Sequence, residues 1–216
     1  MQIAVLGTGT VGRTLGTALV AAGHTVVMGA REAGNSTAAA WAEAAGKGAR
    51  TGTFADAAEG AHLIFLCARG EYAAAVLEAA GREHLKGKTV VDVTNPLDFS
   101  KGMPPTLFVS NTDSLAEQLQ RAFPEAHIVK SLNTLTADLM LAPTRLPEPT
   151  AVFVSGNDAA AKAEVSALLA SFGWAQIVDL GDITTARGTE SWLALWIRLW
   201  GALGTPHFNL KLVKQG

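Results

Sequence analysis

The chain has 216 residues, of which 49% are hydrophobic and 17% are charged. Its 17 basic and 19 acidic residues give a formal net charge of −2, so the composition offers no electrostatic basis for binding nucleic acid or an anionic membrane. The charged fraction is below the roughly 25% of an average soluble domain. We therefore expect a ligand or a second subunit to cover part of the surface.

The single cysteine, Cys67, excludes an intramolecular disulfide and a metal cluster built from several cysteines. It lies inside the apolar run LIFLCA, which predicts a buried structural thiol. The histidines have no metal-ligand spacing, so we expect no metal site. The segment MQIAVLGTGTVG lacks a basic leader, and no stretch reaches the ~18 apolar residues of a membrane span. These features predict a cytoplasmic protein without a membrane segment.

Short β-rich runs alternate with alanine-rich helical stretches along the chain. Strands are predicted at QIAVLG, TVVMG, HLIFLCA, KTVVDVTNP, HIVKSLNT, AVFVSG (151–156) and AQIVDLG (175–181), and helices near residues 10–22, 37–46, 70–85, 114–123 and 159–172. Ser114 and Glu117 have the spacing of a helix capping box. This alternation predicts a doubly wound α/β fold with a mostly parallel sheet and helices on both faces.

The segment APTRLPEPT (142–150) contains three prolines and resembles a linker. It separates a predicted dinucleotide-binding domain, residues 1–142, from a short C-terminal α/β extension, residues 151–216. The extension ends in SWLALWIRLWGALG, which predicts a helix that is apolar nearly all round. Such a helix is expected to be buried, either in the core or in a homodimer interface, and we favour the homodimer.

The motif GTGTVG places Gly7, Gly9 and Gly12 in G-x-G-x-x-G spacing, directly after a predicted buried strand and before a helix. In that context the pattern predicts a dinucleotide-binding site of the Rossmann type. Gly7 would allow the tight turn, Gly9 the approach of a pyrophosphate, and Gly12 the packing of helix on strand. Thr8, Thr10 and Val11 complete this loop.

The end of the second predicted strand, VVMGAREAGNS, carries Arg31 where an NAD site has an acidic residue. An acid there would bind the ribose 2′-hydroxyl and repel a 2′-phosphate, whereas a guanidinium can bind the phosphate with two hydrogen bonds. Thr8, Asn35 and Ser36 can supply further donors. The sequence therefore favours NADP over NAD, although Glu32 stands next to Arg31.

Taken in order, GTGTVG, GARE, VVDVTNP and SLNTL resemble the NADPH-dependent coenzyme F420 reductases, within the group of F420-dependent NADP oxidoreductase-like proteins. The cytosolic oxidoreductase domains of six-transmembrane metalloreductases are similar. The resemblance continues through FVSGND and LGDITTAR to HFNLKLV. It implies a domain that holds NADP(H) and a C-terminal part that closes a cleft over a second redox partner, either coenzyme F420 or a flavin such as FMN. Hydride transfer between two such rings depends mainly on proximity and orientation.

The resemblance also implies roles for individual residues at the ends of predicted strands. Thr8 and Arg31 would bind the 2′-phosphate, Ala68 and Arg69 would line the ribose and pyrophosphate, and Asn95 and Pro96 would border the nicotinamide. Asn133, Thr134 and Leu135 would form the floor where the two rings meet. The family tends to have Ser-Arg where this chain has Ala30 and Arg31, and often histidine where it has Asn133.

Two other functions remain open at the level of sequence. The enzyme would otherwise be an NADPH-dependent reductase of a small imine, carbonyl or ferric substrate, or the chain would be a dinucleotide-binding sensor without turnover. Lys130 and Asn133 have the K-x-x-N spacing of a β-hydroxyacid dehydrogenase, but on a strand an odd separation is expected to point their side chains to opposite faces. Asp92 is interpreted as a satisfied interior carboxylate.

Overall fold

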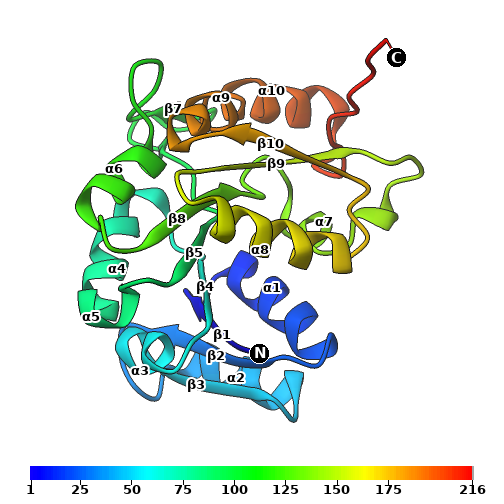
Figure 1. Ribbon diagram of the computed structural model, residues 1–216. Coiled ribbons are helices and arrows are strands. Elements are labelled where there is room, and N and C mark those ends of the chain that lie inside the picture. The colour runs from blue at the N-terminus through cyan, green and yellow to red at the C-terminus, as the bar shows by residue number, and fades with distance from the viewer. Residues whose placement is uncertain (216) are drawn as a thin grey trace.

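The computed structural model describes residues 1–215, whose centre is an eight-stranded sheet covered by helices on both faces (Figure 1). Its strands are β1 (Gln2–Leu6), β2 (Thr25–Ala30), β3 (Ala49–Thr53), β4 (Leu63–Leu66), β5 (Thr89–Asp92), β8 (His127–Ser131), β9 (Ala151–Gly156) and β10 (Gln176–Gly181). They lie in the order β10-β9-β8-β5-β4-β1-β2-β3, and all neighbours are parallel except β8 and β9. A separate hairpin pairs β6 (Leu97–Asp98) with β7 (Thr106–Leu107). The predicted doubly wound, mostly parallel fold is confirmed.

The helices divide between the two faces of the sheet. One face carries α1 (Thr10–Ala21), α2 (Ser36–Ala45), α7 (Ala137–Met140) and α8 (Ala159–Ser171). The other carries α3 (Phe54–Glu59), α4 (Ala73–Ala80), α5 (Arg82–Leu85), α6 (Leu115–Ala122) and the start of α9 (Ala186–Ser191). The last helix is α10 (Leu193–Leu203), and short 3₁₀ turns cover Gly70–Tyr72, Pro143–Arg145 and Ile183–Thr185.

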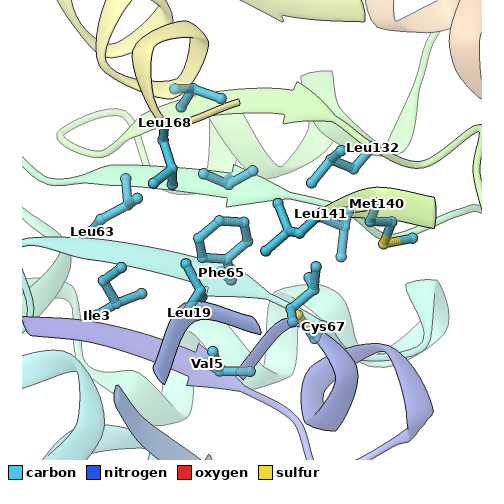
Figure 2. Packing of buried hydrophobic residues seen from close by; sticks show 14 of the residues in the cluster. Ile3, Val5, Leu19, Leu63, Phe65, Cys67, Leu132, Met140, Leu141 and Leu168 are labelled. Carbon is cyan, nitrogen blue, oxygen red and sulfur yellow. The ribbon is translucent and has the colours of Figure 1, made fainter. Parts of the chain in front are cut away.

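The central strands are apolar throughout because they face a core on both sides. Along β1, Ile3 and Val5 point into the core beneath α1 and α2, while Ala4 and Leu6 point into the opposite core. Figure 2 shows Ile3 and Val5 packed in the same cluster as Phe65 of β4. The continuous apolar run QIAVLG therefore predicted its double burial correctly.

The sequence pattern predicted neither β3 nor α3. Because β3 precedes it, HLIFLCA forms the fourth strand in chain order and not the third. β3 reads ARTGT and has no buried position, because it is an edge strand with a solvent-facing side. The edge strand is defined by its pairing with β2 rather than by its own composition.

The C-terminal extension adds β9 and β10 to the same sheet. β9 runs antiparallel to β8 because only α7 and a 3₁₀ turn connect them, without the helical crossover that a parallel pair needs. β10 then pairs parallel to β9 through α8, as the βαβ pattern predicted. The extension therefore belongs to the same sheet as residues 1–142.

α10 is not fully buried within residues 1–215, which disfavours the core alternative and leaves the favoured homodimer interface as a prediction. Leu193 and Trp196 face inward, and the Trp196 ring stacks on Phe208 with 5.4 Å between centroids. Leu195, Trp200 and Leu203 keep 48%, 42% and 56% of their surface exposed. Within residues 1–215, no helix has the length and apolar character required to cross a membrane.

Candidate functional site

The loop GTGTVG lies where the sheet changes winding direction, between β1 and its neighbours β2 and β4. The amide of Gly7 donates to the carbonyl of Gly29, and a Cβ on Gly7 would stand 2.7 Å from the carbonyl oxygen of Cys67. The φ angle of Gly7 is +131°, which an L side chain rarely adopts. Gly7 thus makes the tight turn that the motif predicted, at the topological switch point where such sheets bind ligands.

Gly9 and Gly12 have opposite surroundings. A Cβ on Gly12 would stand 2.1 Å from the carbonyl oxygen of Gly7, so only glycine allows α1 to pack this closely on the loop. A Cβ on Gly9 would meet no atom within 4 Å. Gly9 is also the N-cap of α1 and has no side chain, so no side-chain hydrogen bond caps the first amides of the helix. These features fit a pyrophosphate bound at the N-terminus of the helix.

Arg31 follows the last residue of β2 and is exposed. It forms no ion pair within the described residues 1–215. Asn35 caps α2, because its Oδ1 accepts a hydrogen bond of 3.0 Å from the Ala38 amide. This bond leaves the Asn35 amide N–H groups free to donate, and Ser36 is exposed beside them at the start of α2. The arrangement presents donors and a positive charge at one strand end, as a 2′-phosphate requires.

A cleft of about 520 Å³ opens at the carboxyl ends of β4 and β5. It is lined by Val11, Ala68, Arg69, Gly70, Val93, Thr94, Asn95, Leu97 and Phe99. The structure therefore brings together four of the predicted residues, Val11, Ala68, Arg69 and Asn95. Sequence reasoning missed Leu97 and Phe99, which come from the β6–β7 hairpin and carry no motif.

Pro96, Asn133, Thr134 and Leu135 are buried and do not line this cleft. Asn133 lies behind Asn95 and is bound to it. Its Nδ2 donates to Oδ1 of Asn95 at 2.9 Å and to the carbonyl of Thr189 at 3.0 Å, while Asn95 Nδ2 donates to the Asn133 carbonyl at 2.9 Å. The predicted contact of Asn133, Thr134 and Leu135 with the two rings stays a prediction.

The turn after β8 is held in an unusual backbone conformation. Leu132 has a φ angle of +63°, a left-handed conformation that costs a non-glycine residue about 1 kcal/mol or more. Its buried side chain points into the core, where Figure 2 shows it near Met140 and Leu141. The reversal at Leu132 directs Asn133 toward Asn95 and α9.

Lys130 is buried beneath the cleft, with 1% of its side chain exposed. Its ammonium lies 2.9 Å from Asp92, 2.9 Å from Glu190 and 2.6 Å from the carbonyl of Thr94. Burial works to lower the pKa of Lys130, but the two carboxylates outweigh it and the net shift is upward. All three N–H donors therefore have acceptors, and the ammonium stays charged with no proton directed at the cleft.

The expectation that Lys130 and Asn133 point to opposite faces was wrong. β8 ends at Ser131, so Asn133 lies beyond the strand, and the left-handed turn at Leu132 brings it round. Both side chains contact α9, at Glu190 and at the carbonyl of Thr189. The interpretation of Asp92 as a satisfied interior carboxylate is confirmed, since it also accepts hydrogen bonds from the amide and hydroxyl of Thr94.

Arg69 lies at the edge of the cleft, paired with Glu71 at 2.6 Å and placed 5.7 Å from the centroid of the Phe99 ring. It also borders a second hollow of about 650 Å³ between α4, α6 and the β6–β7 hairpin. Cys67 is buried, and burial raises the pKa of its thiol, with Asp92 adding to the effect. In the described part of the chain, no three His, Cys, Asp or Glu side chains are grouped to hold a metal ion.

Known proteins are similar to this chain in sequence and in fold. The family model described as NADP oxidoreductase, coenzyme F420-dependent, matches residues 2–96. A provisionally assigned F420-dependent NADP reductase from Arthrobacter sp. FB24, known as a crystal structure, is 54% identical with a TM-score of 0.95 and covers 99% of this chain and 100% of its own. The chain belongs to the coenzyme F420-dependent NADP oxidoreductase family. It is therefore an NADP-dependent oxidoreductase, and the sensor without turnover is set aside.

More distant similarities are found as well. The F420-dependent NADP reductase of Methanothermobacter marburgensis is 28% identical over 208 residues, which is 92% of either chain. Metalloreductase STEAP3 of Rattus norvegicus is 29% identical over 191 residues, or 88% of this chain, but the chain spans only 36% of that relative's length. A reductive aminase from Aspergillus terreus, 20% identical with a TM-score of 0.65 over 94% of this chain and 62% of its own, shares the fold.

Proposed function

We propose that this enzyme exchanges hydride between the nicotinamide of NADP(H) and the deazaflavin ring of coenzyme F420. Support comes from the family and from a relative of nearly equal length, the F420-dependent NADP reductase of M. marburgensis. When bound, the two cofactors supply the redox chemistry themselves. The chain's own task is to bind them, orient their rings and exclude competing reactions.

The observation that carries the proposal is the lining of the 520 Å³ cleft. Its one ionisable side chain among the described residues is Arg69, and the remaining lining is small, apolar or amide-bearing. An arginine does not lose its proton near neutral pH, so the cleft supplies no general acid. Ring-to-ring hydride transfer needs none, because a ring nitrogen can exchange its proton with water.

In this proposal, each part of the predicted site has one role. The amides of the loop Gly7–Gly12 and of the first turn of α1 bind the pyrophosphate. Arg31, with Thr8, Asn35 and Ser36, binds the 2′-phosphate. Ala68 and Arg69 hold the ribose side, and Asn95 borders the nicotinamide.

The alternative acceptors fit the cleft less well. A small imine or carbonyl becomes an amine or alcohol and requires a proton in the transition state, for which the cleft has no donor. FMN and ferric chelates remain acceptors to be tested. The solved imine reductase of Myxococcus stipitatus and the reductive aminase of A. terreus are 21% and 20% identical to this chain, which shows a shared fold only.

The test follows NADPH oxidation by absorbance with F420, FMN, a ferric chelate, a cyclic imine or no acceptor. Rapid oxidation with F420, together with reverse reduction of NADP by reduced F420, is the expected result. Turnover with the imine or the ferric chelate at rates that F420 does not reach would overturn the proposal. NADPH binding without oxidation by any acceptor would also contradict it.

A further inference from the structure

The short helix α9 is bound to both turns that border the cleft. Two consecutive residues of α9 make these contacts. The backbone carbonyl of Thr189 accepts a hydrogen bond from Asn133, and the carboxylate of Glu190 accepts one from Lys130. Asn133 is bound in turn to Asn95, after β5, and Lys130 donates to the Thr94 carbonyl directly before it. α9 therefore holds the turn after β5 and the turn after β8 in one arrangement.

Glu190 is itself anchored at the other end. Its two carboxylate oxygens accept hydrogen bonds from the backbone amides of Leu115 and Ala116, at 2.8 and 3.0 Å, where α6 begins. Those amides belong to the first turn of α6 and have no partner inside the helix, so the carboxylate satisfies them. Lys130 thus connects β8 with β5 and α9 directly, and with α6 through Glu190.

Stability alone does not account for this network. Lys130, Asp92 and Glu190 are 1%, 0% and 1% exposed, and two carboxylates share one cation. A buried ion pair is often replaceable by apolar side chains without loss of stability, because the desolvation of the charges offsets their attraction. What the charged group provides here is direction, since its three N–H bonds go to β5, to the turn directly after β5 and to α9.

We propose that Lys130 is a positioning residue for the nicotinamide. Held between Asp92 and Glu190, its ammonium fixes the Thr94–Asn95 turn through the carbonyl of Thr94. The proposal rests on the placement of the NADP nicotinamide beside Asn95 given under the proposed function. Thr94 and Asn95 line the cleft, whereas Lys130 and Glu190 do not. Their effect on the nucleotide must therefore travel through the turn.

The test compares two ligands that differ in the nicotinamide half. NADPH spans the whole site, whereas adenosine 2′,5′-bisphosphate carries the adenine and 2′-phosphate alone and binds near Arg31. Dissociation constants for both ligands would be measured by calorimetry on the wild type, Asp92→Asn and Glu190→Gln, with the melting temperature of each. We expect both variants to weaken NADPH by about tenfold, as loss of a charge-assisted bond allows, and to change the fragment by less than about twofold.

Glu117→Gln is the matched control. Glu117 binds Arg187 of α9 at 2.6 Å and so also connects α6 with α9, but it does not touch Lys130. It should lower the melting temperature and leave the ratio of the two dissociation constants unchanged. A change in that ratio equal to that of Glu190→Gln would show that docking of α9 in general is responsible, which overturns the role of Lys130.

Two further outcomes would overturn the proposal. Equal loss of both ligands in Asp92→Asn and Glu190→Gln would indicate a structural role only, as would unfolding of both variants. Unchanged NADPH affinity in both would show that the turn keeps its place without the network. No acceptor is present in these measurements, so they are independent of whether F420 is the physiological partner.

Discussion

Asn95 and Asn133 bind each other across the ends of β5 and β8, through two hydrogen bonds of 2.9 Å. The side-chain amide of Asn133 donates to Oδ1 of Asn95, and the side-chain amide of Asn95 donates to the backbone carbonyl of Asn133. Asn133 makes a third bond, to the carbonyl of Thr189. The side chains are therefore used to join two turns. Only the outer residue, Asn95, reaches the cleft.

We expect Asn133→Ala to lower the free energy of unfolding by about 2 to 3 kcal/mol, because two side-chain bonds are lost and two buried acceptors remain unpaired. NADPH affinity should fall as well, since the Asn95 turn loses its support. Asn209→Ala is the control: its Nδ2 also makes two bonds, to Thr150 and Ala151, and none of these three residues lines the cleft. Denaturant unfolding and NADPH titration would check both, and an unaltered NADPH affinity in Asn133→Ala would contradict the expectation.

Arg31 is predicted to decide between NADP and NAD. Arg31→Asp should weaken NADPH by about 2 kcal/mol or more, roughly thirtyfold, because an attractive charge is replaced by a repulsive one. NADH affinity should change little. Arg50→Asp is the control, because Arg50 is exposed on β3 but pairs in register with Val27, at the other end of β2. Equal losses for NADPH and NADH would mean that Arg31 does not contact a 2′-phosphate.

The two glycines around the N-terminus of α1 should respond differently to alanine. Gly12→Ala places a Cβ 2.1 Å from a backbone oxygen and should destabilise the fold by about 1 to 3 kcal/mol. Gly9→Ala meets no neighbour, and its φ of −71° suits alanine, so the melting temperature should stay within a few degrees. Its Cβ would occupy the space proposed for the pyrophosphate. Thermal unfolding and nucleotide titration should therefore separate the variants, and normal NADPH binding by Gly9→Ala would place the pyrophosphate elsewhere.

Acid should weaken the contact between α6 and α9 through Glu117. The bonds from Arg187 hold the pKa of Glu117 below its ordinary value of 4.5, so the folded protein binds fewer protons than the unfolded chain. The contribution is complete above about pH 4.5 and is lost as the pH falls below it. Glu117→Gln should therefore cost stability at pH 7, by about 1 kcal/mol or more, and less at pH 3.

Asp113 provides the comparison for this pH dependence. Arg121 holds its pKa at about 2, but the Arg121 side chain is 60% exposed, and solvent screens the pair. Asp113→Asn should therefore cost less at pH 7 than Glu117→Gln. Urea unfolding at pH 7, 5 and 3 measures both, and a Glu117→Gln penalty that is equal at pH 3 and pH 7 would rule out the ion pair as its source.

The homodimer stays a prediction, and the exposed side of α10 is the surface expected to form its interface. Leu195, Trp200 and Leu203 leave an apolar surface on that helix with no partner inside residues 1–215. If a second copy covers it, Trp200→Glu should convert a dimer into a monomer in sedimentation velocity, while Leu193 and Trp196 keep the helix attached. A wild-type chain that sediments as a monomer at all concentrations would dismiss the dimer.

Features that depend only on neighbouring residues along the chain could be predicted from the sequence. GTGTVG forms its tight turn because the backbone has a positive φ at Gly7 and leaves no room for a Cβ at Gly12, beside the carbonyl of Gly7. Both requirements lie within one loop. QIAVLG and LIFLCA form strands that are buried on both faces. Successive side chains of a strand point to opposite faces of the sheet, so an apolar residue is needed at every position. Such constraints are written in consecutive residues, so composition and spacing were sufficient to predict them.

Tertiary structure decided what depends on residues far apart. The edge strand β3 is recognisable by its pairing with β2, and the exposed side of α10 by the absence of a covering element in the described residues. Lys130 meets Asp92 and Glu190, which lie in other elements of the chain, only because β5, β8 and α9 converge beneath the cleft. No spacing rule connects three such residues, since burial and charge pairing are properties of the packed molecule rather than of any segment.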